Sequence, residues 1–561
     1  MTAAGWLEIV VFIALVGATT IPLGGYMAKV FAGERTFLHP LIAPVERLVY
    51  RAAGVSPDQE QGWLTYALCL LGFHALATLA LYALLRQQAH LPFNPQHLKA
   101  VAPDLAMNTA VSFVTNTSWQ AYAGEQTLSN LSQMAGITVA SFLSGAAGIA
   151  VAVALIRGFV RRDAQAIGNY WVDQTRAVLY VLLPLSVVAA IVLVALGVPQ
   201  TLDPSALATT LEGGKQLIAL GPVASQEAVK LLSGDGGGFF NANSAHPFEN
   251  PGALSNLLEM GLMCVIGAGL TNTFGRMVGN PRQGWALLGA MAILFTAGTA
   301  AIYASETHVP PALAHAGVIG PNLEGKEVRF GAPGSSLFAE AATATADGAV
   351  NSAHDSYMPL SGAVLMVNMK IGEVIVGAPG SGLFSILLFA LLSVFIAGLM
   401  IGRTPEYLGK KIETREMRLT MLAALAAPAI TLGLTALAVS LPMGLSARQA
   451  SGAHGLSEIL YAYTSAAATN GSAFAGLNAN TPFYNITLAL GMLVGRFAVI
   501  VPVLGIAGSL AAKPRMQTAH AAMPTDNGMF VALLIGVILI IGGLCYFPVL
   551  TLAPLLEHFS M

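Results

Sequence analysis

The chain has 561 residues, of which 55% are hydrophobic and only 10% are charged, and its formal net charge is −2. A water-soluble domain carries about 25% charged residues, so this composition excludes a large soluble enzyme, and it excludes a disordered chain as well. The near-balance of charge argues against a nucleic-acid partner. The composition therefore predicts an α-helical protein that crosses a membrane many times.

Ten segments are long and apolar enough to cross a bilayer, which takes about 20 residues each. They run over residues 6–30, 62–85, 130–157, 174–198, 254–277, 283–304, 380–402, 417–440, 485–511 and 527–552. The first lacks a basic leader and a clear cleavage site, so we interpret it as a retained span. A further apolar stretch, 357–378, is separated from the seventh segment by a Gly/Pro cluster, and we expect 357–402 to be one interrupted crossing.

Basic residues predict the orientation, because cytoplasmic loops carry an excess of Lys and Arg. With 357–402 taken as one crossing, the loops on one side hold 17 of the 26 basic residues and the opposite loops hold 7, while Lys370 and Arg496 lie inside spans. Two full crossings would invert the second half of the chain. The bias favours one crossing and places both termini outside the cytoplasm.

Four long non-cytoplasmic loops, at 86–129, 199–253, 305–356 and 441–484, share a layout. Each holds a short apolar piece with helical character and then a turn rich in small, amide or glycine residues. In these turns Gln120, Gly236, Gly348 and Gly471 are 116, 112 and 123 residues apart. A repeat of about 115 residues predicts four parallel copies of span, pore loop and span around one pseudo-tetrameric pore.

The fold class is thus an all-α polytopic membrane protein of about ten transmembrane helices. The expected segments are an extra N-terminal span and loop at 1–61, pore repeats at 62–162, 163–279, 280–412 and 413–516, and a C-terminal span at 517–561.

The turns suggest a chemistry of ion desolvation. Four re-entrant helix ends around one axis can offer rings of backbone carbonyl oxygens that replace the hydration shell of a monovalent cation. The alternative is four ordinary Gly/Asn-rich external turns, which are common. Their regular period on one side of the membrane favours the pore.

Five stretches together resemble one family. Residues 236–251 read GGGFFNANSAHPFENP, 115–122 read TNTSWQAY, 402–411 read GRTPEYLGKK, 470–477 read NGSAFAGL and 495–497 read GRF. In order, and across the whole chain, they resemble the potassium-binding A subunits (KdpA) of bacterial Kdp potassium-transporting P-type ATPases. The resemblance implies a potassium-channel-like pore with a selectivity filter near the outer face.

The resemblance also implies the filter residues, repeat by repeat. They are Asn116, Thr117 and Gln120; Gly234, Asp235 and Gly236; Ala346, Asp347 and Gly348; and Thr469, Asn470 and Gly471. The family usually has Thr-Asn at Gly234-Asp235, a hydroxyl residue at Ala346, no acid at Asp347 and often Asn at Thr469. Backbone carbonyls survive these changes. The two acids either raise the local attraction for cations or are solvated caps of a turn.

Three charged residues fall within apolar segments, where charge is costly and usually faces a cavity or a partner. Lys370 and Glu373 are three residues apart, which also suits a structural ion pair on a helix. The resemblance implies that Arg496 lies below the filter and blocks straight passage. It also implies that Gly377, Pro379, Gly380 and Gly382 belong to a gating loop that diverts potassium sideways toward a catalytic subunit.

No phosphorylation sequence Asp-Lys-Thr-Gly-Thr and no phosphate-binding glycine loop is present, so we expect no ATP hydrolysis by this chain and no cofactor apart from transported potassium. The partners implied by the resemblance are the catalytic subunit KdpB, KdpC and the small KdpF, within the lipids of a bacterial inner membrane. Three separated cysteines and the histidines His246 and His354 indicate neither a disulfide framework nor a metal site; we expect the histidines to anchor loops.

Other function classes stay open. A potassium channel or transporter subunit that works alone, or under a ligand, would use the same fold. A secondary transporter usually has inverted repeats and a site at the midplane. A membrane scaffold without transport would leave the four turns unexplained.

Overall fold

The computed structural model describes residues 1–203, 205–516 and 523–561. Ten helices in these ranges are long and apolar enough to span a membrane, and each overlaps one predicted span. The prediction of a ten-span helical protein is confirmed. Of the predicted C-terminal segment 517–561, residues 517–522 lie outside the described residues.

The spans keep the predicted order, and three of them contain a short π-helical piece. They are α1 (Ala3–Ala32), α3 (Trp63–Gln87), the π-helical Ser132–Thr138 with α6 (Val139–Val160), α7 (Tyr170–Arg176) joined by π-helical Ala177–Leu182 to α8 (Leu183–Ala195), α10 (Ala253–Met277), α11 (Pro281–Glu306), α15 (Ser381–Met400), α16 (Thr414–Ser440), α19 (Pro482–Ala511), and α20 (Gly528–Leu550) continued through π-helical Thr551–Leu555 into α21 (Leu556–Ser560).

Local sequence explains where these helices begin and end. The Thr2 hydroxyl caps the first turn of α1, and Gly33, with φ of 77°, ends that helix in the left-handed conformation. The Thr481 side chain caps α19, whose first residue, Pro482, needs no amide partner. Capping matters at the start of a span because the first amides of a helix have no partner within the helix, and an unbonded amide near hydrocarbon costs free energy.

Burial divides the spans into an inner and an outer set. The apolar windows of α6, α10, α15 and α19 are 83%, 61%, 67% and 61% buried, whereas those of α3, the α7–α8 helix, α11 and α16 are 22%, 39%, 44% and 28% buried. Each repeat therefore contributes one outer span followed by one inner span. The first and last spans, α1 and α20, are both 22% buried and lie at the periphery.

A short buried helix lies between the outer and inner span of every repeat. These pore helices are α4 (Pro103–Val114), α9 (Val223–Leu232), α13 (Gly331–Ala344) and α18 (Gly452–Ala467). The third repeat has an extra helix, α14 (Pro359–Lys370), which packs against α13 and α18 before the chain breaks at 371–380 and resumes as α15. With 12 residues, α14 is too short to cross a bilayer alone.

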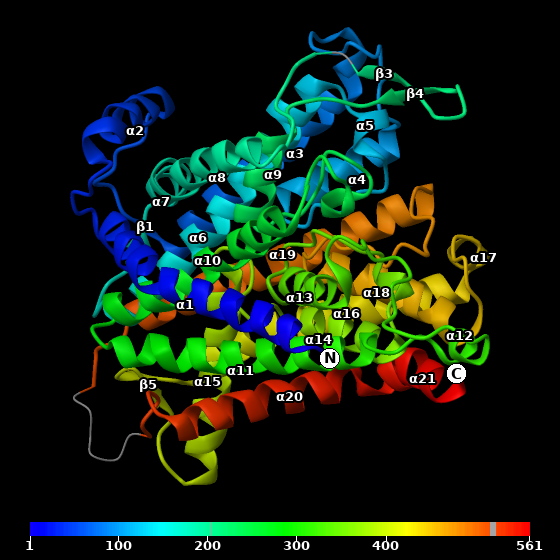
Figure 1. Ribbon diagram of the computed structural model, residues 1–561. Helices are drawn as coiled ribbons and strands as arrows, with labels where there is room; N and C mark the ends of the chain where they lie inside the picture. The colour runs from blue at the N-terminus through cyan, green and yellow to red at the C-terminus, as the bar shows by residue number, and fades with distance from the viewer. Residues whose placement is uncertain (204, 517–522) are drawn as a thin grey trace.

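The remaining elements lie at the two ends of the bundle (Figure 1). At the end that holds the pore loops are α5 (Gly124–Thr127), α12 (Pro311–His315), α17 (Pro442–Leu445) and the hairpin of β3 (Ala206–Thr209) and β4 (Lys215–Ile218). At the other end are α2 (His39–Ala53), the pair β1 (Gln61–Gly62) and β2 (Ala166–Gly168), and the pair β5 (Glu406–Tyr407) and β6 (Lys410–Lys411). All strand pairs are antiparallel. Single turns of 3-10 helix occur at Gln88–His90, Asn243–Ala245 and His354–Ser356.

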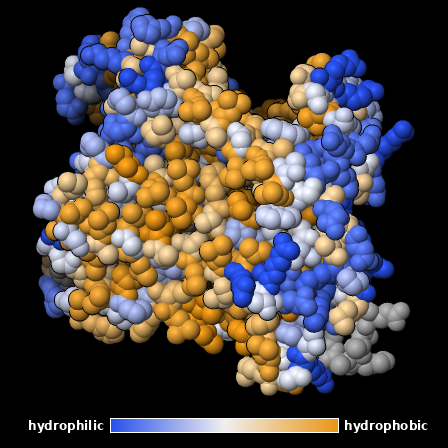
Figure 2. Space-filling view, turned by 180° about the vertical axis from the view of Figure 1, so that it is seen from behind, coloured by the Kyte–Doolittle hydropathy of each residue, from blue (hydrophilic) through white to orange (hydrophobic). Residues whose placement is uncertain are grey.

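Hydrophobic side chains form a wide band across the middle of the surface, and polar residues gather at both ends (Figure 2). Leu7, Leu68, Ile191 and Leu544 are among the large apolar side chains that are at least 60% exposed. Such a continuous apolar surface exceeds what a soluble protein shows and suits contact with lipid chains.

We predict that the pore-loop end faces away from the cytoplasm. Leu211, in the β3–β4 turn, and Asp58, between α2 and β1, are exposed residues at opposite ends of the bundle. In a variant without the three native cysteines, an impermeant maleimide should label Leu211→Cys in intact spheroplasts. It should label Asp58→Cys only after permeabilisation. The opposite pattern would show that the count of basic residues gives the wrong orientation.

Candidate ion-binding site

The four pore helices end in loops of one backbone shape. The second loop residue has φ between 52° and 65° (Asn116, Gly234, Ala346 and Thr469), and the fourth has φ between 55° and 94° (Ser118, Gly236, Gly348 and Gly471). Both values lie in the left-handed region that glycine adopts most easily. Three of the four fourth positions are glycine, and the recurrence of the shape supports the fourfold repeat.

This comparison corrects the register of the first loop. Ser118, and not Gln120, is the counterpart of Gly236, Gly348 and Gly471. Gln120 instead clamps the neighbouring loop: its Nε2 donates to the Gly238 carbonyl and its Oε1 accepts from the Gly238 amide, both at 3.0 Å. Gln120 thus supports the site from outside.

The loop amides are bonded back to the pore helices. In each loop the third and fourth amides donate to one residue near the end of the preceding helix, at 2.9 to 3.3 Å; the acceptors are Ser112, Lys230, Ala342 and Ser465. The carbonyl oxygens of Thr117, Asp347 and Asn470 accept no hydrogen bond from the described part of the chain. The loops therefore direct these N–H groups toward the pore helices and leave carbonyl oxygens free of hydrogen bonds from the protein.

Backbone contacts join these loops into a ring. A Cβ atom added at Gly236 would overlap the carbonyl of Asp347, one at Gly348 that of Asn470, and one at Gly471 that of Thr117. The second loop therefore touches the third, the third touches the fourth, and the fourth touches the first. Glycine is required at these seams because the neighbouring carbonyl occupies the space of a side chain.

The remaining seam, between the first and second loops, is closed by side chains. Ser118 Oγ donates to Asp235 Oδ1 at 2.6 Å, and Asn116 Nδ2 donates to the Gly234 carbonyl at 2.6 Å. Ser144 of α6 donates to Asp235 Oδ2 at 3.2 Å. Here a serine replaces the glycine found at the other three seams, and its hydroxyl makes the contact.

Neither acid of these loops is a solvated cap of a turn, because Asp235 and Asp347 are both 0% exposed. Both oxygens of Asp235 accept hydroxyl hydrogen bonds. Asp347 Oδ1 accepts from the Ala349 amide at 3.3 Å, whereas its Oδ2 is buried without a protein partner. The two acids lie within the packed wall of the ring.

The break at 371–380 contacts all four repeats below the ring. Pro379 and Gly380 press against Gly148 of α6, Val376 against Gly267 of α10, and the Gly377 amide donates to the Ala344 carbonyl at 3.2 Å. Glu373 Oε1 accepts from the Thr469 hydroxyl at 2.8 Å. The segment therefore lies across the inner mouth of the ring.

Two expectations about this segment need correction. Gly382 lies in the first turn of α15, since that helix begins at Ser381 and Gly380, with φ of 96°, is its N-cap. Lys370 and Glu373 do not share a helix, because α14 ends at Lys370 and Glu373 has φ of 60°. They form no ion pair: Lys370 Nζ contacts the Met366 sulfur at 3.9 Å and lies 5.3 Å from the centre of the Tyr546 ring.

A cavity adjoins the inner side of the ring, between α15, α16, α19 and α20. Its lining includes Lys370, Glu373, Thr469 and Arg496. Arg496 is 4% exposed, and its Nη2 donates to the Ser144 carbonyl at 3.1 Å. Arg496 Nε and Glu373 Oε2 are buried without a protein partner, and such unpaired polar atoms suit bound water or an ion.

The two histidines singled out in the sequence anchor loops. His354 Nδ1 bonds the Tyr461 hydroxyl of α18 at 2.8 Å, and burial lowers the pKa of His354 to about 3. The His246 ring stacks on Phe240 at 3.8 Å, and burial lowers its pKa as well. Both therefore act as neutral side chains in the loops that frame the ring.

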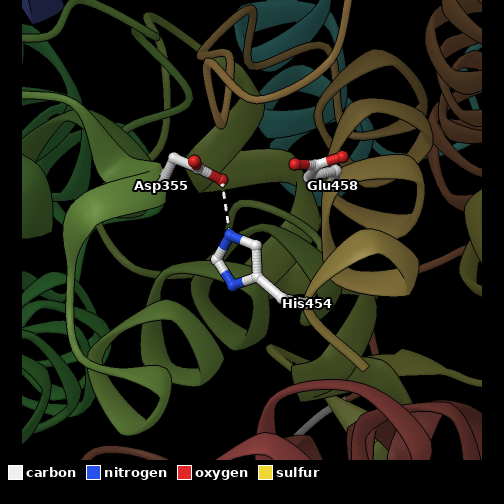
Figure 3. Close-up of side chains that lie close together, drawn as sticks. All are labelled: Asp355, His454 and Glu458. Carbon is white, nitrogen blue, oxygen red and sulfur yellow. Dashed lines mark hydrogen bonds and ion pairs between the residues drawn. The ribbon is translucent and has the colours of Figure 1, made fainter. Parts of the chain in front are cut away.

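A third histidine, His454, lies in a cluster of acids (Figure 3). Its Nε2 is 2.9 Å from Asp355 and its Nδ1 is 2.7 Å from Glu557 of α21. Glu458 lies beside it, with geometry that could hold a metal, but its two oxygens accept the amides of Gln449 and Ala450. Since the partners satisfy one another, we interpret the cluster as an ionic anchor that ties the C-terminal helix to α18.

Sequence reasoning missed Ser118, Ser144 and His454. Counting from the end of each pore helix would have found Ser118, because the fourth loop position follows that end by four residues in every repeat. The sequence carries no signal for Ser144 and His454, whose partners are 91 and 103 residues away.

Comparison with known proteins gives a consistent result. The family model described as potassium-transporting ATPase A subunit matches residues 10–559. A Methylobacterium nodulans protein named potassium-transporting ATPase potassium-binding subunit is 60% identical over 560 residues, covering 100% of this chain and 98% of that protein. A protein of the same name from Granulibacter bethesdensis is 58% identical over 564 residues, covering 100% and 99%.

Among solved structures, the potassium transporter TrkH from Vibrio parahaemolyticus is similar with a TM-score of 0.52. The similarity covers 89% of this chain and 98% of that one, at 14% sequence identity. At this identity the similarity concerns the fold alone.

We predict that the His454 anchor weakens as pH rises. Hydrogen bonds to Asp355 and Glu557 raise the pKa of His454 to about 10 from its usual 6.5. The folded state then keeps a proton that the unfolded chain loses, so this stabilisation is complete below pH 6.5 and falls away as pH rises to about 10. Since the group is partly exposed, we expect the effect to be about 1 kcal/mol.

The measurement is the melting temperature in detergent between pH 6 and 10, for the native chain and for His454→Gln. The difference between the two should shrink with rising pH. His558→Gln, on the same helix α21, is the control. A difference that does not change with pH would refute the charged anchor.

Proposed function

The chain belongs to the potassium-transporting ATPase A subunit family, and we propose that it binds and translocates potassium in a high-affinity, ATP-driven uptake system. The observation that carries this proposal is the ring of loops with bonded amides and available carbonyls. Such a ring offers oxygens to a dehydrated cation without requiring a particular side chain.

The proposed filter consists of the second, third and fourth residues of each loop. They are Asn116, Thr117 and Ser118; Gly234, Asp235 and Gly236; Ala346, Asp347 and Gly348; and Thr469, Asn470 and Gly471. Because the backbone supplies the ligands, the family-atypical side chains at Gly234, Asp235, Ala346, Asp347 and Thr469 are compatible with potassium binding. Gln120 holds the filter and does not bind the ion.

Below the filter, the segment 371–380 and Arg496 form the proposed barrier to straight passage. Gly377, Pro379 and Gly380 cross the inner mouth, and Gly382 begins the helix that follows. A fixed positive charge at Arg496 repels a cation that leaves the filter along the axis. The cavity beside it, lined by Lys370 and Glu373, is the proposed sideways route.

The sideways route leads to the proposed partner. In this assembly the chain is a non-catalytic subunit, and the catalytic P-type ATPase subunit KdpB supplies the energy, together with KdpC and the small KdpF. The location is the bacterial inner membrane, with both termini on the extracytoplasmic side. The pore repeats are those at 62–162, 163–279, 280–412 and 413–516, flanked by 1–61 and 517–561.

The alternative is a potassium channel or transporter subunit that works without an ATPase, since a structure named as a potassium transporter shares the fold. Purification in mild detergent separates the two. The ATP-driven proposal predicts a co-purifying P-type ATPase subunit and ATP hydrolysis stimulated by potassium. A chain that purifies alone and conducts potassium passively would contradict it.

We predict that Gly348→Ala weakens potassium binding by about tenfold, or about 1.4 kcal/mol, because the added Cβ must displace a carbonyl of the neighbouring loop. Gly348 has φ of 78°, and an added Cβ would overlap the Asn470 carbonyl. The half-saturating potassium concentration for ATP hydrolysis is the measurement.

Gly213→Ala is the matched control for this substitution. Gly213 has φ of 81° in the β3–β4 turn, where an added Cβ meets nothing within 4 Å. The control carries the same backbone strain without the overlap at the ring, so its potassium dependence should match that of the native chain. Equal behaviour of both variants would remove Gly348 from the proposed filter.

A further inference from the structure

The second filter loop is the one that most needs external support. It continues from Gly236 into Gly237 and Gly238, and three successive glycines leave the intervening peptides more free to rotate than any other sequence would. If one of these peptides rotated, its N–H group would take the position of its carbonyl oxygen. Gln120 fixes Gly238, which leaves the peptide after Gly236 to be held by something else.

Asn243 holds this peptide. Its Nδ2 donates to the Gly236 carbonyl at 2.7 Å, and its Oδ1 lies 3.4 Å from the Val350 amide, two residues beyond Gly348. Asn243 is 7% exposed and has φ of 53°, an uncommon conformation for a residue other than glycine. It therefore stands behind the seam between the second and third loops.

Lys230 fixes Asn243 in turn. The Lys230 ammonium donates to Asn243 Oδ1 at 2.8 Å, to Glu249 at 2.6 Å and to Glu227 at 2.8 Å. It also lies 3.3 Å from the Ser244 hydroxyl, and the side chain is 1% exposed. Because Lys230 occupies the Oδ1 side of the amide, the Asn243 NH2 group must face the Gly236 carbonyl.

The same lysine also holds the loop through its backbone. Its carbonyl accepts the amides of Asp235 and Gly236 at 2.9 and 3.2 Å. Glu249 bonds the Phe240 amide at 2.8 Å with its other oxygen, which links the far end of the glycine run to the same ammonium. Both ends of the flexible segment are therefore tied to one buried charge.

We propose that Lys230 and Asn243 are positioning residues that set potassium affinity and selectivity by holding the peptide after Gly236. This inference rests on the proposed potassium filter and deepens it. It also gives a physical role to the stretch 236–251, which supplies Asn243 and Glu249. A buried ion pair adds little net stability by itself, so its value here is a fixed geometry.

The test is Asn243→Asp in the complete purified complex. Aspartate has the shape of asparagine and still accepts from Lys230, but it offers an oxygen to the Gly236 carbonyl in place of a donor. Loss of one hydrogen bond to the loop should raise the half-saturating potassium concentration about tenfold. The maximal rate should stay unchanged, and discrimination against sodium should fall.

The matched control removes a buried ion pair of the same kind elsewhere. Lys326 and Glu306 are paired at 2.9 Å with both side chains 0% exposed, and neither bonds a filter residue. Lys326→Met with Glu306→Gln should lower the melting temperature but leave the potassium dependence unchanged. Lys230→Met with both Glu227→Gln and Glu249→Gln, which likewise leaves neither paired glutamate charged, should shift that dependence as Asn243→Asp does.

The outcomes separate this inference from the function on which it rests. If potassium neither raises the melting temperature of the native complex nor stimulates its ATP hydrolysis, the proposed function is wrong and the inference fails with it. If the native complex responds and Asn243→Asp stays within twofold of it, only the positioning role is wrong. An equal shift in the Lys326 control would also overturn it, because general destabilisation would then explain the result.

Discussion

A peptide group at membrane depth must find a hydrogen-bond partner, because hydrocarbon offers none. The carbonyl oxygens of the four pore loops are the exception to this constraint, and the helices of the molecule surround them. Four loops satisfy their amides within the protein and leave carbonyl oxygens for an ion. The pore helices supply the acceptors for those amides, the inner spans bury the helices, and the outer spans cover them.

Much of the fold could be predicted from the sequence, because bilayer thickness fixes the length of a span and its apolar composition. The fourfold layout could be predicted as well, because the spans and the long loops between them recur at a regular spacing. The conformation of the loops was harder to predict. The family resemblance implied Gln120 as a filter residue of the first repeat, yet Ser118 adopts the left-handed conformation of the fourth loop position there. The spacing of Lys370 and Glu373 suggested a helical pair, but the helix ends between them.

Contacts between distant segments explain what the sequence could not reveal. The four seams of the ring use different means: three rely on a glycine beneath a carbonyl, and one on a serine that bonds an aspartate. Side-chain hydrogen bonds to the loops are also unevenly distributed, since Gln120 and Asn243 both bond the second loop. The partners in the contacts between loops are more than 100 residues apart, so local sequence does not show which residues meet.

The unevenness of the seams has a consequence for how such a pore can change. In a channel built from four identical chains, any substitution is applied four times at once. Here one gene encodes four different quarters, so each seam can vary while three stay constant. Ser118 beside Asp235, and an acid at Asp347, are differences of this kind. Ion preference in this architecture can therefore drift in small steps that a symmetric pore does not permit.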